Sequence, residues 1–170
     1  MKKLLPVTLS MILILSVLFA SSASPVGAKG PKVLKFNSMV GVPAGLTGTQ
    51  SQAVLRGISG GGLPWVIGEA SGELRANGHL KISVQGLVLA AGANTGSNPA
   101  ATFRGLVSCV TSDGSVENIL TDPFPATTGL ASAGGGNAEI VADLAIPQPC
   151  IAPIIFVTNA NGSWFAATGL

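Results

Sequence analysis

One serine of this sequence lies in a pattern that hydrolases with a nucleophilic serine use. Residues 57–61 read G-I-S-G-G and fit G-x-S-x-G, a motif that exposes its serine where a strand turns sharply into a helix. Ser59 is instead followed by more glycines and by Leu63-Pro64, and no helix is predicted there. The only histidine, His79, lies at a predicted hairpin turn, whereas serine hydrolysis needs a base that a third group orients. We interpret residues 57–61 as a connector.

Two pairs of carboxylates have the residue types that glycoside hydrolysis requires, Glu69 with Glu73 and Glu139 with Asp143. Each pair is separated by four residues along one predicted strand, which is about 13 Å at ~3.3 Å per residue. This distance is too long for one pair to act as acid and nucleophile. We therefore predict solvated sheet faces and a protein without catalytic residues, and a hydrolase is the least favoured alternative.

Metal ligands and cofactor motifs are scarce. A structural zinc ion needs four ligands, usually cysteine and histidine, and the sequence has two cysteines and one histidine. Calcium needs six to eight oxygen ligands, and the acidic residues near the predicted turn, Asp113 and Glu117, do not form such a set. We predict no metal site and no cofactor.

A small-ligand or glycan site is the alternative that the aromatic and amide residues favour. Trp65 has outward parity in the hairpin described below, so its ring could stack on a sugar; the favoured interpretation is that it packs against Leu89, its predicted cross-strand partner, or under a loop. The polar loop 91–101 contributes Asn94 and Asn98. His79, which also has outward parity, completes the candidate ligand-binding residues.

These residues depend on one long predicted hairpin, residues 63–90. Its residues alternate in polarity with period 2, which indicates strands with one face in a core and one in water. The even-numbered residues are apolar or small and the odd-numbered ones polar: Val66, Ala70, Gly72, Leu74, Leu80, Ile82, Val84 and Val88 against Glu69, Ser71, Glu73, Arg75, His79, Lys81, Ser83 and Gln85. The turn contains Asn77-Gly78. A three-residue loop with Gly78 left-handed keeps the faces matched, whereas a two-residue loop mixes them.

That loop predicts the register of the hairpin. Leu74 lies opposite Leu80, and Glu73 lies opposite Lys81, as an ion pair on the outer face. Further strands are predicted over residues 53–58, 102–112, 115–120, 137–146, 154–159 and 163–168, with turns at Asp113-Gly114 and Asn161-Gly162. No segment after residue 28 shows convincing helical periodicity. The prediction is an all-β fold, a single-domain antiparallel β-sandwich of about eight or nine strands.

The N-terminus is predicted to be a signal peptide, residues 1–28. Lys2 and Lys3 precede an apolar run over residues 4–20, and small residues offer cleavage after Ala23 or after Ala28. A retained membrane anchor is the alternative. Residues 29–52 are predicted as a leader with a loop or edge strand, and residues 53–170 as the sandwich domain. We expect a secreted or extracytoplasmic protein that has no membrane segment once the signal is removed.

Two further properties follow from composition. An exported chain with two cysteines favours a disulfide between Cys109 and Cys150. Without Lys2 and Lys3, the nine basic residues fall to seven and balance the seven acidic residues. A neutral surface of this kind argues against a nucleic-acid partner.

Three segments of the mature chain together resemble a group of uncharacterised secreted bacterial β-sandwich proteins. These segments are R-G-I-S-G-G-G-L-P-W at residues 56–65, E-L-R-A-N-G-H-L-K-I-S-V-Q-G-L-V at residues 73–88, and A-A-T-G at residues 166–169. The resemblance implies an exported domain with one disulfide and no known activity. The predicted export, the disulfide, the neutral charge and the scarcity of catalytic groups support the first functional hypothesis, a non-catalytic surface, adhesion or assembly module with a homo-oligomer or a cell-surface partner.

Overall fold

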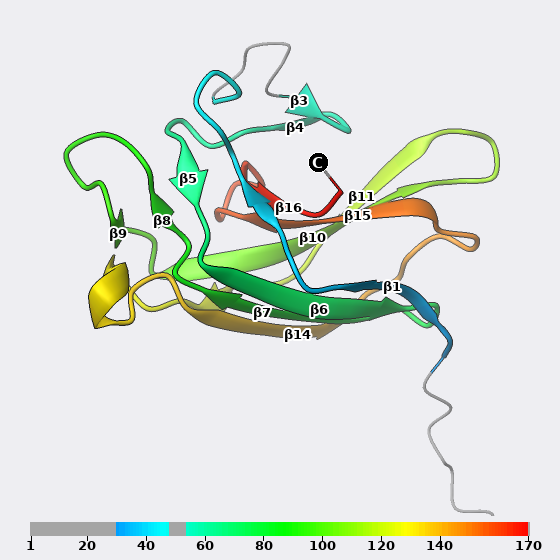
Figure 1. Cartoon of the computed structure of the whole chain (residues 1–170). Helices are drawn as coiled ribbons and strands as arrows, with labels where there is room; N and C mark the ends of the chain where they lie inside the picture. The colour runs from blue at the N-terminus through cyan, green and yellow to red at the C-terminus, as the bar shows by residue number, and fades with distance from the viewer. Residues whose placement is uncertain (1–29, 48–53, 170) are drawn as a thin grey trace, which may run out of the picture.

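The protein is an all-β, antiparallel structure in a computed structural model that describes residues 30–47 and 54–169. The predicted signal peptide, residues 1–28, and both of its cleavage sites lie outside the described residues. Among those residues no helix is long and apolar enough to cross a membrane. Figure 1 shows two main sheets stacked face to face. The strands are β1 (Lys32–Phe36), β2 (Val40–Gly41), β3 (Val54–Leu55), β4 (Ile58–Ser59), β5 (Trp65–Val66), β6 (Glu69–Arg75), β7 (His79–Gln85), β8 (Val88–Leu89), β9 (Ser97–Asn98), β10 (Thr102–Val110), β11 (Val116–Leu120), β12 (Phe124–Pro125), β13 (Gly129–Leu130), β14 (Ala138–Asp143), β15 (Ile151–Thr158) and β16 (Trp164–Ala167), with a 3₁₀ turn, η2, at Ala131–Ala133.

The first sheet has four strands in the order β1-β6-β7-β14, and the second has the order β11-β10-β15-β16-β2, with β12 paired to β10. Eight of the described strands have four residues or more: β1, β6, β7, β10, β11, β14, β15 and β16. The predicted fold class is therefore confirmed. The edge strand expected between residues 29 and 52 corresponds to two strands in the structure. β1 lies at one edge of the first sheet, and β2 lies at one edge of the second.

The long hairpin has the predicted register. Leu74 pairs with Leu80 and Gly72 with Ile82, and Gly78 closes the three-residue loop with a φ of 85°. The N–H of Gly78 donates to the carbonyl of Arg75 at 2.9 Å. Matching the faces of the two arms was thus sufficient to choose between the loop lengths.

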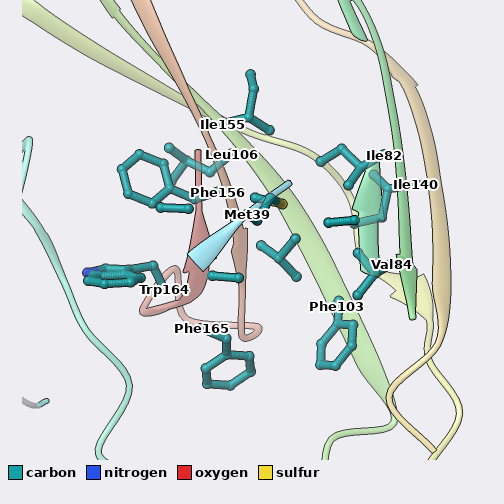
Figure 2. Close-up of a cluster of buried hydrophobic side chains, with 14 of the residues drawn as sticks. Met39, Ile82, Val84, Phe103, Leu106, Ile140, Ile155, Phe156, Trp164 and Phe165 are labelled. Atoms are coloured by element: carbon teal, nitrogen blue, oxygen red, sulfur yellow. The ribbon is translucent and has the colours of Figure 1, made fainter. Parts of the chain in front are cut away.

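The core lies between the two sheets and is built from the even-numbered side chains of the hairpin and of β14. Ile82, Val84 and Ile140 face the buried residues of the second sheet, as Figure 2 shows. Gly105 of β10 marks the closest approach, because a Cβ atom there would lie 3.1 Å from Leu80 and 3.2 Å from Ile82. Glycine thus lets the β10 backbone approach the facing side chains.

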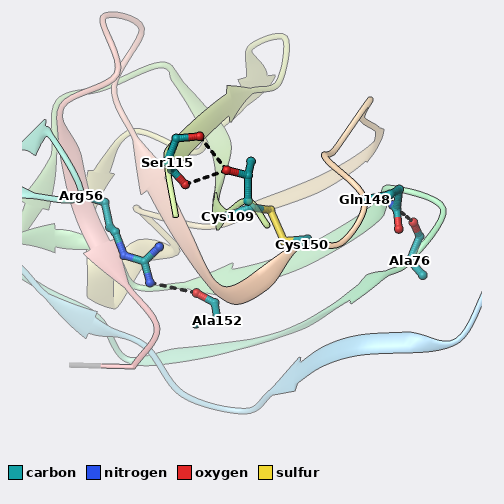
Figure 3. The surroundings of a disulfide bond; sticks show 8 residues. Arg56, Ala76, Cys109, Ser115, Gln148, Cys150 and Ala152 are labelled. Atoms are coloured by element: carbon teal, nitrogen blue, oxygen red, sulfur yellow. Dashed lines mark hydrogen bonds between the residues drawn. A yellow bond between two sulfur atoms is a disulfide. The ribbon is translucent and has the colours of Figure 1, made fainter. Parts of the chain in front are cut away.

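The other face of the second sheet is also covered, by the small hairpin β3–β4 (Figure 1). The sequence predicted one strand over residues 53–58; the described part is a hairpin whose turn residues, Arg56 and Gly57, have φ of 54° and 79°. Two positive φ values are what a tight turn of type I′ needs, and arginine gives no sequence signal for it. The guanidinium of Arg56 donates to the carbonyl of Ala152 at 3.0 Å (Figure 3).

The predicted disulfide is present. Cys109, in strand β10 of the second sheet, is bonded to Cys150, which directly precedes β15, with 4.9 Å between their Cα atoms (Figure 3). The two cysteines are 41 residues apart, and closing a loop of this length stabilises a fold by about 4 kcal/mol in the chain-entropy model. The bond fixes the long connection after β14 to the core.

Candidate ligand-binding face

Trp65 lies in the core, as the packing interpretation predicts, and the outward orientation that its parity indicated is wrong. It pairs with Leu89 as predicted, but only 5% of its surface is exposed. Its ring is stacked on Phe165, with 4.0 Å between ring centroids, and meets Phe103 edge-on at 6.5 Å. A ring held between two others offers no face to a sugar.

The cause is a break in the hairpin at Gly68 and Gly86. Strands β5 and β8 form a small sheet of their own rather than continuing β6 and β7, and Gly86 is left-handed with a φ of 63°. Beyond these two glycines, toward β5 and β8, some side chains therefore point to the opposite side from the one that the predicted alternation gives. Val66 is half exposed, and Leu87 is fully buried.

The two asparagines of loop 91–101 differ in their availability. Asn98 is 1% exposed; its amide donates to the carbonyls of Ala100 and Thr127, both at 2.8 Å, and accepts from the N–H of Ala100 at 2.9 Å. These bonds hold the loop, so Asn98 serves the structure rather than presenting its amide to a ligand. Asn94 is exposed, and its carbonyl accepts from the N–H of Ser97.

His79 and Ser59 belong to different sheets. His79 begins β7, and its Nδ1 lies 2.8 Å from the carboxylate of Asp143 on β14. Ser59 ends β4 in the covering hairpin, and a loop rather than a helix follows it. The structure therefore pairs His79 with a carboxylate, a contact that the sequence did not predict because the neighbour of β7 was unknown.

The solvent side of the four-stranded sheet gathers polar side chains from four strands. We call it the polar face. It consists of Lys35, Asn37, Glu69, Ser71, Glu73, Lys81, Ser83, Gln85 and Glu139. The register places Ser71 opposite Ser83, and Ser83 opposite Glu139, so that one row of side chains crosses three strands. The neighbouring rows contain Glu69 with Gln85, and Lys35 with Glu73 and Lys81.

Three adjoining hollows lie on the polar face. The first, of about 250 Å³, is lined by Asn37, Glu69, Ser71, Ser83 and Gln85 among others. The second, of about 430 Å³, lies over Lys35, Lys81 and Glu139. The third, of about 460 Å³, is lined by Ser83, Gln85, Asn137 and Glu139. Since Ser83 lines all three, they form one shallow, continuous surface.

Several side chains of the polar face are free to bind. Within the described residues, the side chains of Asn37, Ser71 and Gln85 make no hydrogen bond, and those of Lys35, Lys81 and Glu69 make no ion pair. Glu139 accepts a hydrogen bond from the hydroxyl of Ser83. The face thus offers carboxamide, hydroxyl, ammonium and carboxylate groups together.

Glu73 is the one residue of the polar face with a strongly held charge. Its carboxylate lies 2.7 Å from Lys32 Nζ and 2.5 Å from Arg75 Nη2. The hydrogen bond from Lys32, reinforced by Arg75, lowers the pKa of Glu73 to about 2. The predicted register opposite Lys81 is confirmed, but the predicted ion pair is wrong, because Lys32 on the edge strand and Arg75 on the same strand reach the carboxylate instead.

The polar face was partly visible in the sequence, because outward parity already grouped Ser71, Ser83 and Gln85 on one side of the hairpin. What no sequence signal indicated is that β1 and β14 flank that hairpin.

No group of three or more metal-ligating residues occurs within residues 30–47 and 54–169. Comparison with protein-family models, curated proteins and solved structures finds no match to this chain, and the resemblance to uncharacterised secreted proteins stays a prediction.

Proposed function

We propose that this chain is a non-catalytic binding module that works outside the cytoplasm and recognises a hydroxyl-rich ligand, such as a glycan, through its polar face. The observation that carries the proposal is the continuous hollowed surface across β1, β6, β7 and β14, with hydrogen-bonding side chains that have no described partner. Export is supported by the predicted signal peptide and by the disulfide. A surface or adhesion role follows from these two properties.

The chemistry of the hollows suits sugar hydroxyls. A hydroxyl both donates and accepts, and a carboxamide such as that of Gln85 or Asn37 offers two donors and an acceptor. Glu69 and Glu139 add acceptors, and Lys35 and Lys81 add donors.

A non-catalytic role is supported by where the reactive groups lie. The imidazole of His79 is held by Asp143 at the turn end of the sheet, while Ser59 lies in the hairpin that covers the opposite sheet. The carboxylate of Glu73, on the polar face, forms ion pairs with Lys32 and Arg75. These arrangements favour binding over acyl transfer or glycoside cleavage.

The binding proposal is tested by screening the secreted, disulfide-bonded protein on a glycan array and measuring the hits by calorimetry. Gln85→Ala and Asn37→Ala each remove one amide from the first hollow, and each is expected to weaken binding by roughly 5-fold, since one hydrogen bond contributes about 1 kcal/mol. Asn94→Ala, an exposed asparagine away from the polar face, is the matched control and is expected to bind as the unmodified protein does. An array without hits, or equal affinity in all variants, overturns the proposal.

Export is tested separately, by N-terminal sequencing of the protein recovered outside the cells. A mature chain that begins at Ser24 or at Lys29 matches cleavage after Ala23 or Ala28. A chain that keeps Met1 and sediments with membranes would instead support the anchor.

A further inference from the structure

The two edges of the four-stranded sheet carry opposite charge. Within the described residues β1 pairs only with β6, and its exposed lysines are Lys32, which also contacts Glu73, and Lys35. At the opposite edge, β14 carries Glu139 and Asp143, both exposed. The side chain of Asp143 is 82% exposed, although it also contacts His79. One edge strand is thus doubly basic and the other doubly acidic.

The strand directions allow one copy to continue the sheet of another. Neighbouring strands are antiparallel throughout β1-β6-β7-β14, so β1 and β14 run in opposite directions. A second copy moved sideways without rotation therefore brings its β1 antiparallel to β14 of the first. Such a heterologous contact leaves a free edge at each end and can repeat.

The backbone of β14 is available for this pairing. The N–H of Leu144 donates to the carbonyl of Gly78 at 3.0 Å, and this bond continues the register of the ladder between β7 and β14. Because strand hydrogen bonds alternate, the odd-numbered residues of β14 direct their N–H and C=O groups away from β7. On that side Ala138 bridges Ala126 and β12 lies beside the strand, while among the described residues the ladder of β14 is formed with β7 alone.

A hollow of about 320 Å³ lies next to this edge, between the end of β11 and β14. Its lining is mixed, with Leu120, Phe124, Ala142 and Leu144 beside Thr121, Asp122 and Asp143. On β1 the residue that faces inward between the lysines is Leu34, which is half-buried in its own copy. Val141, 46% exposed on β14, adds apolar surface between the two acidic residues.

We propose that copies of this protein associate head to tail, with the basic edge β1 of one copy added as a strand to the acidic edge β14 of the next. Edge charges usually keep sheets apart when both edges have the same sign; here the charges of the two edges attract. The contact involves only four or five residues on each side, so the association is weak, depends on concentration, and falls with salt because the charges are exposed. This inference does not depend on the ligand of the polar face.

The test is a charge swap followed by sedimentation velocity at low salt, with the disulfide intact. Lys32→Glu/Lys35→Glu makes both edges acidic, and Glu139→Lys/Asp143→Lys makes both basic; each protein alone is expected to remain monomeric at concentrations where the unmodified protein forms oligomers. An equimolar mixture of the two restores complementary edges and is expected to form oligomers again. Glu117→Lys, which reverses a charge on β11 of the second sheet, is expected to associate as the unmodified protein does.

A second variant tests strand addition without changing any charge. Val141→Pro removes an N–H that points to the free edge, so the monomer keeps its ladder to β7 while the added strand loses a hydrogen bond. Oligomers are expected to disappear although circular dichroism shows a folded protein. The proposal is overturned if the unmodified protein is monomeric at all concentrations, if the mixture of charge variants stays monomeric, or if the proline variant associates normally.

Discussion

The indole of Trp65 lies flat against the ring of Phe165, with 4.0 Å between ring centroids and 22° between ring planes. Phe103 meets both rings edge-on, at 6.5 Å from Trp65 and 6.0 Å from Phe165. The three rings come from β5, β16 and β10, so this cluster joins the small sheet at the broken end of the hairpin to the second main sheet. Aromatic pairs in this geometry add to the stabilisation from burial.

Trp65→Ala is therefore expected to lower the free energy of unfolding by about 3–5 kcal/mol, the range for removing a buried aromatic side chain. Trp65→Phe, which keeps a ring on Phe165, is expected to cost less. Urea unfolding measures both, with Leu63→Ala, an exposed apolar residue nearby, as the control. A loss no larger than that of the control would mean that Trp65 does not hold the two sheets together.

The same residue shows how far the sequence could predict the fold. The period-2 pattern determined the register from Glu69 to Gln85 because every inward position had an apolar or small residue. It did not show that the chain bends at Gly68 and Gly86, since a left-handed glycine leaves no mark on hydrophobic alternation. The predicted partner of Trp65 was consequently right and the predicted side was wrong.

The candidate site was predictable only within one hairpin. Outward parity placed Ser71, Ser83 and Gln85 on the solvent side, as the structure has them. The hollows also need Lys35 and Glu139, which lie 48 or more residues from Ser83 along the chain and reach it only through the strand order. Strand order depends on long-range packing between sheets, and local propensity carries no information on it.

Two glycines with the same backbone angle test how tightly the hairpin turn is packed. Gly78 and Gly114 both have a φ of 85°, but a Cβ atom at position 78 would lie 1.8 Å from the carbonyl oxygen of Leu144, whereas nothing lies within 4 Å at position 114. Both alanine substitutions incur the cost of positive φ, about 1–2 kcal/mol. Gly78→Ala is expected to lose about 1–3 kcal/mol more in urea unfolding, from overpacking; equal losses would contradict the contact with Leu144.

Two buried hydroxyls should respond in opposite ways to their removal. Ser108 is fully buried and its Oγ has no hydrogen-bond partner, so Ser108→Ala is expected to raise the free energy of unfolding by about 1 kcal/mol. Thr121 is also buried, but its hydroxyl donates to Asp122 at 2.6 Å and accepts from Gly105 N–H at 3.0 Å. Thr121→Val is expected to lower the free energy of unfolding by about 1–3 kcal/mol. Chemical unfolding of both variants checks the contrast, and a destabilised Ser108→Ala would show that its hydroxyl has a partner.

Glu73 predicts a stability change at acid pH. Lys32 and Arg75 lower the pKa of its carboxyl group from 4.5 to about 2 in the folded protein, so the ionised form is favoured by folding. The stabilisation is therefore fully present above pH 4.5 and is lost as the pH falls toward 2. Since the ion pair is partly exposed to water, the effect should also weaken with added salt.

The measurement compares the unmodified protein with Glu73→Gln by urea unfolding between pH 2 and pH 7. The unmodified protein is expected to be the more stable of the two at pH 7, and the difference should shrink steadily below pH 4.5. Because other carboxyl groups titrate equally in both proteins, including Asp113, whose pKa is lowered by the hydroxyl of Thr111, the difference isolates Glu73. Glu69→Gln, on the same strand but without an ion pair among the described residues, is the control. A difference that does not change with pH would mean that Lys32 and Arg75 do not hold the carboxylate in solution.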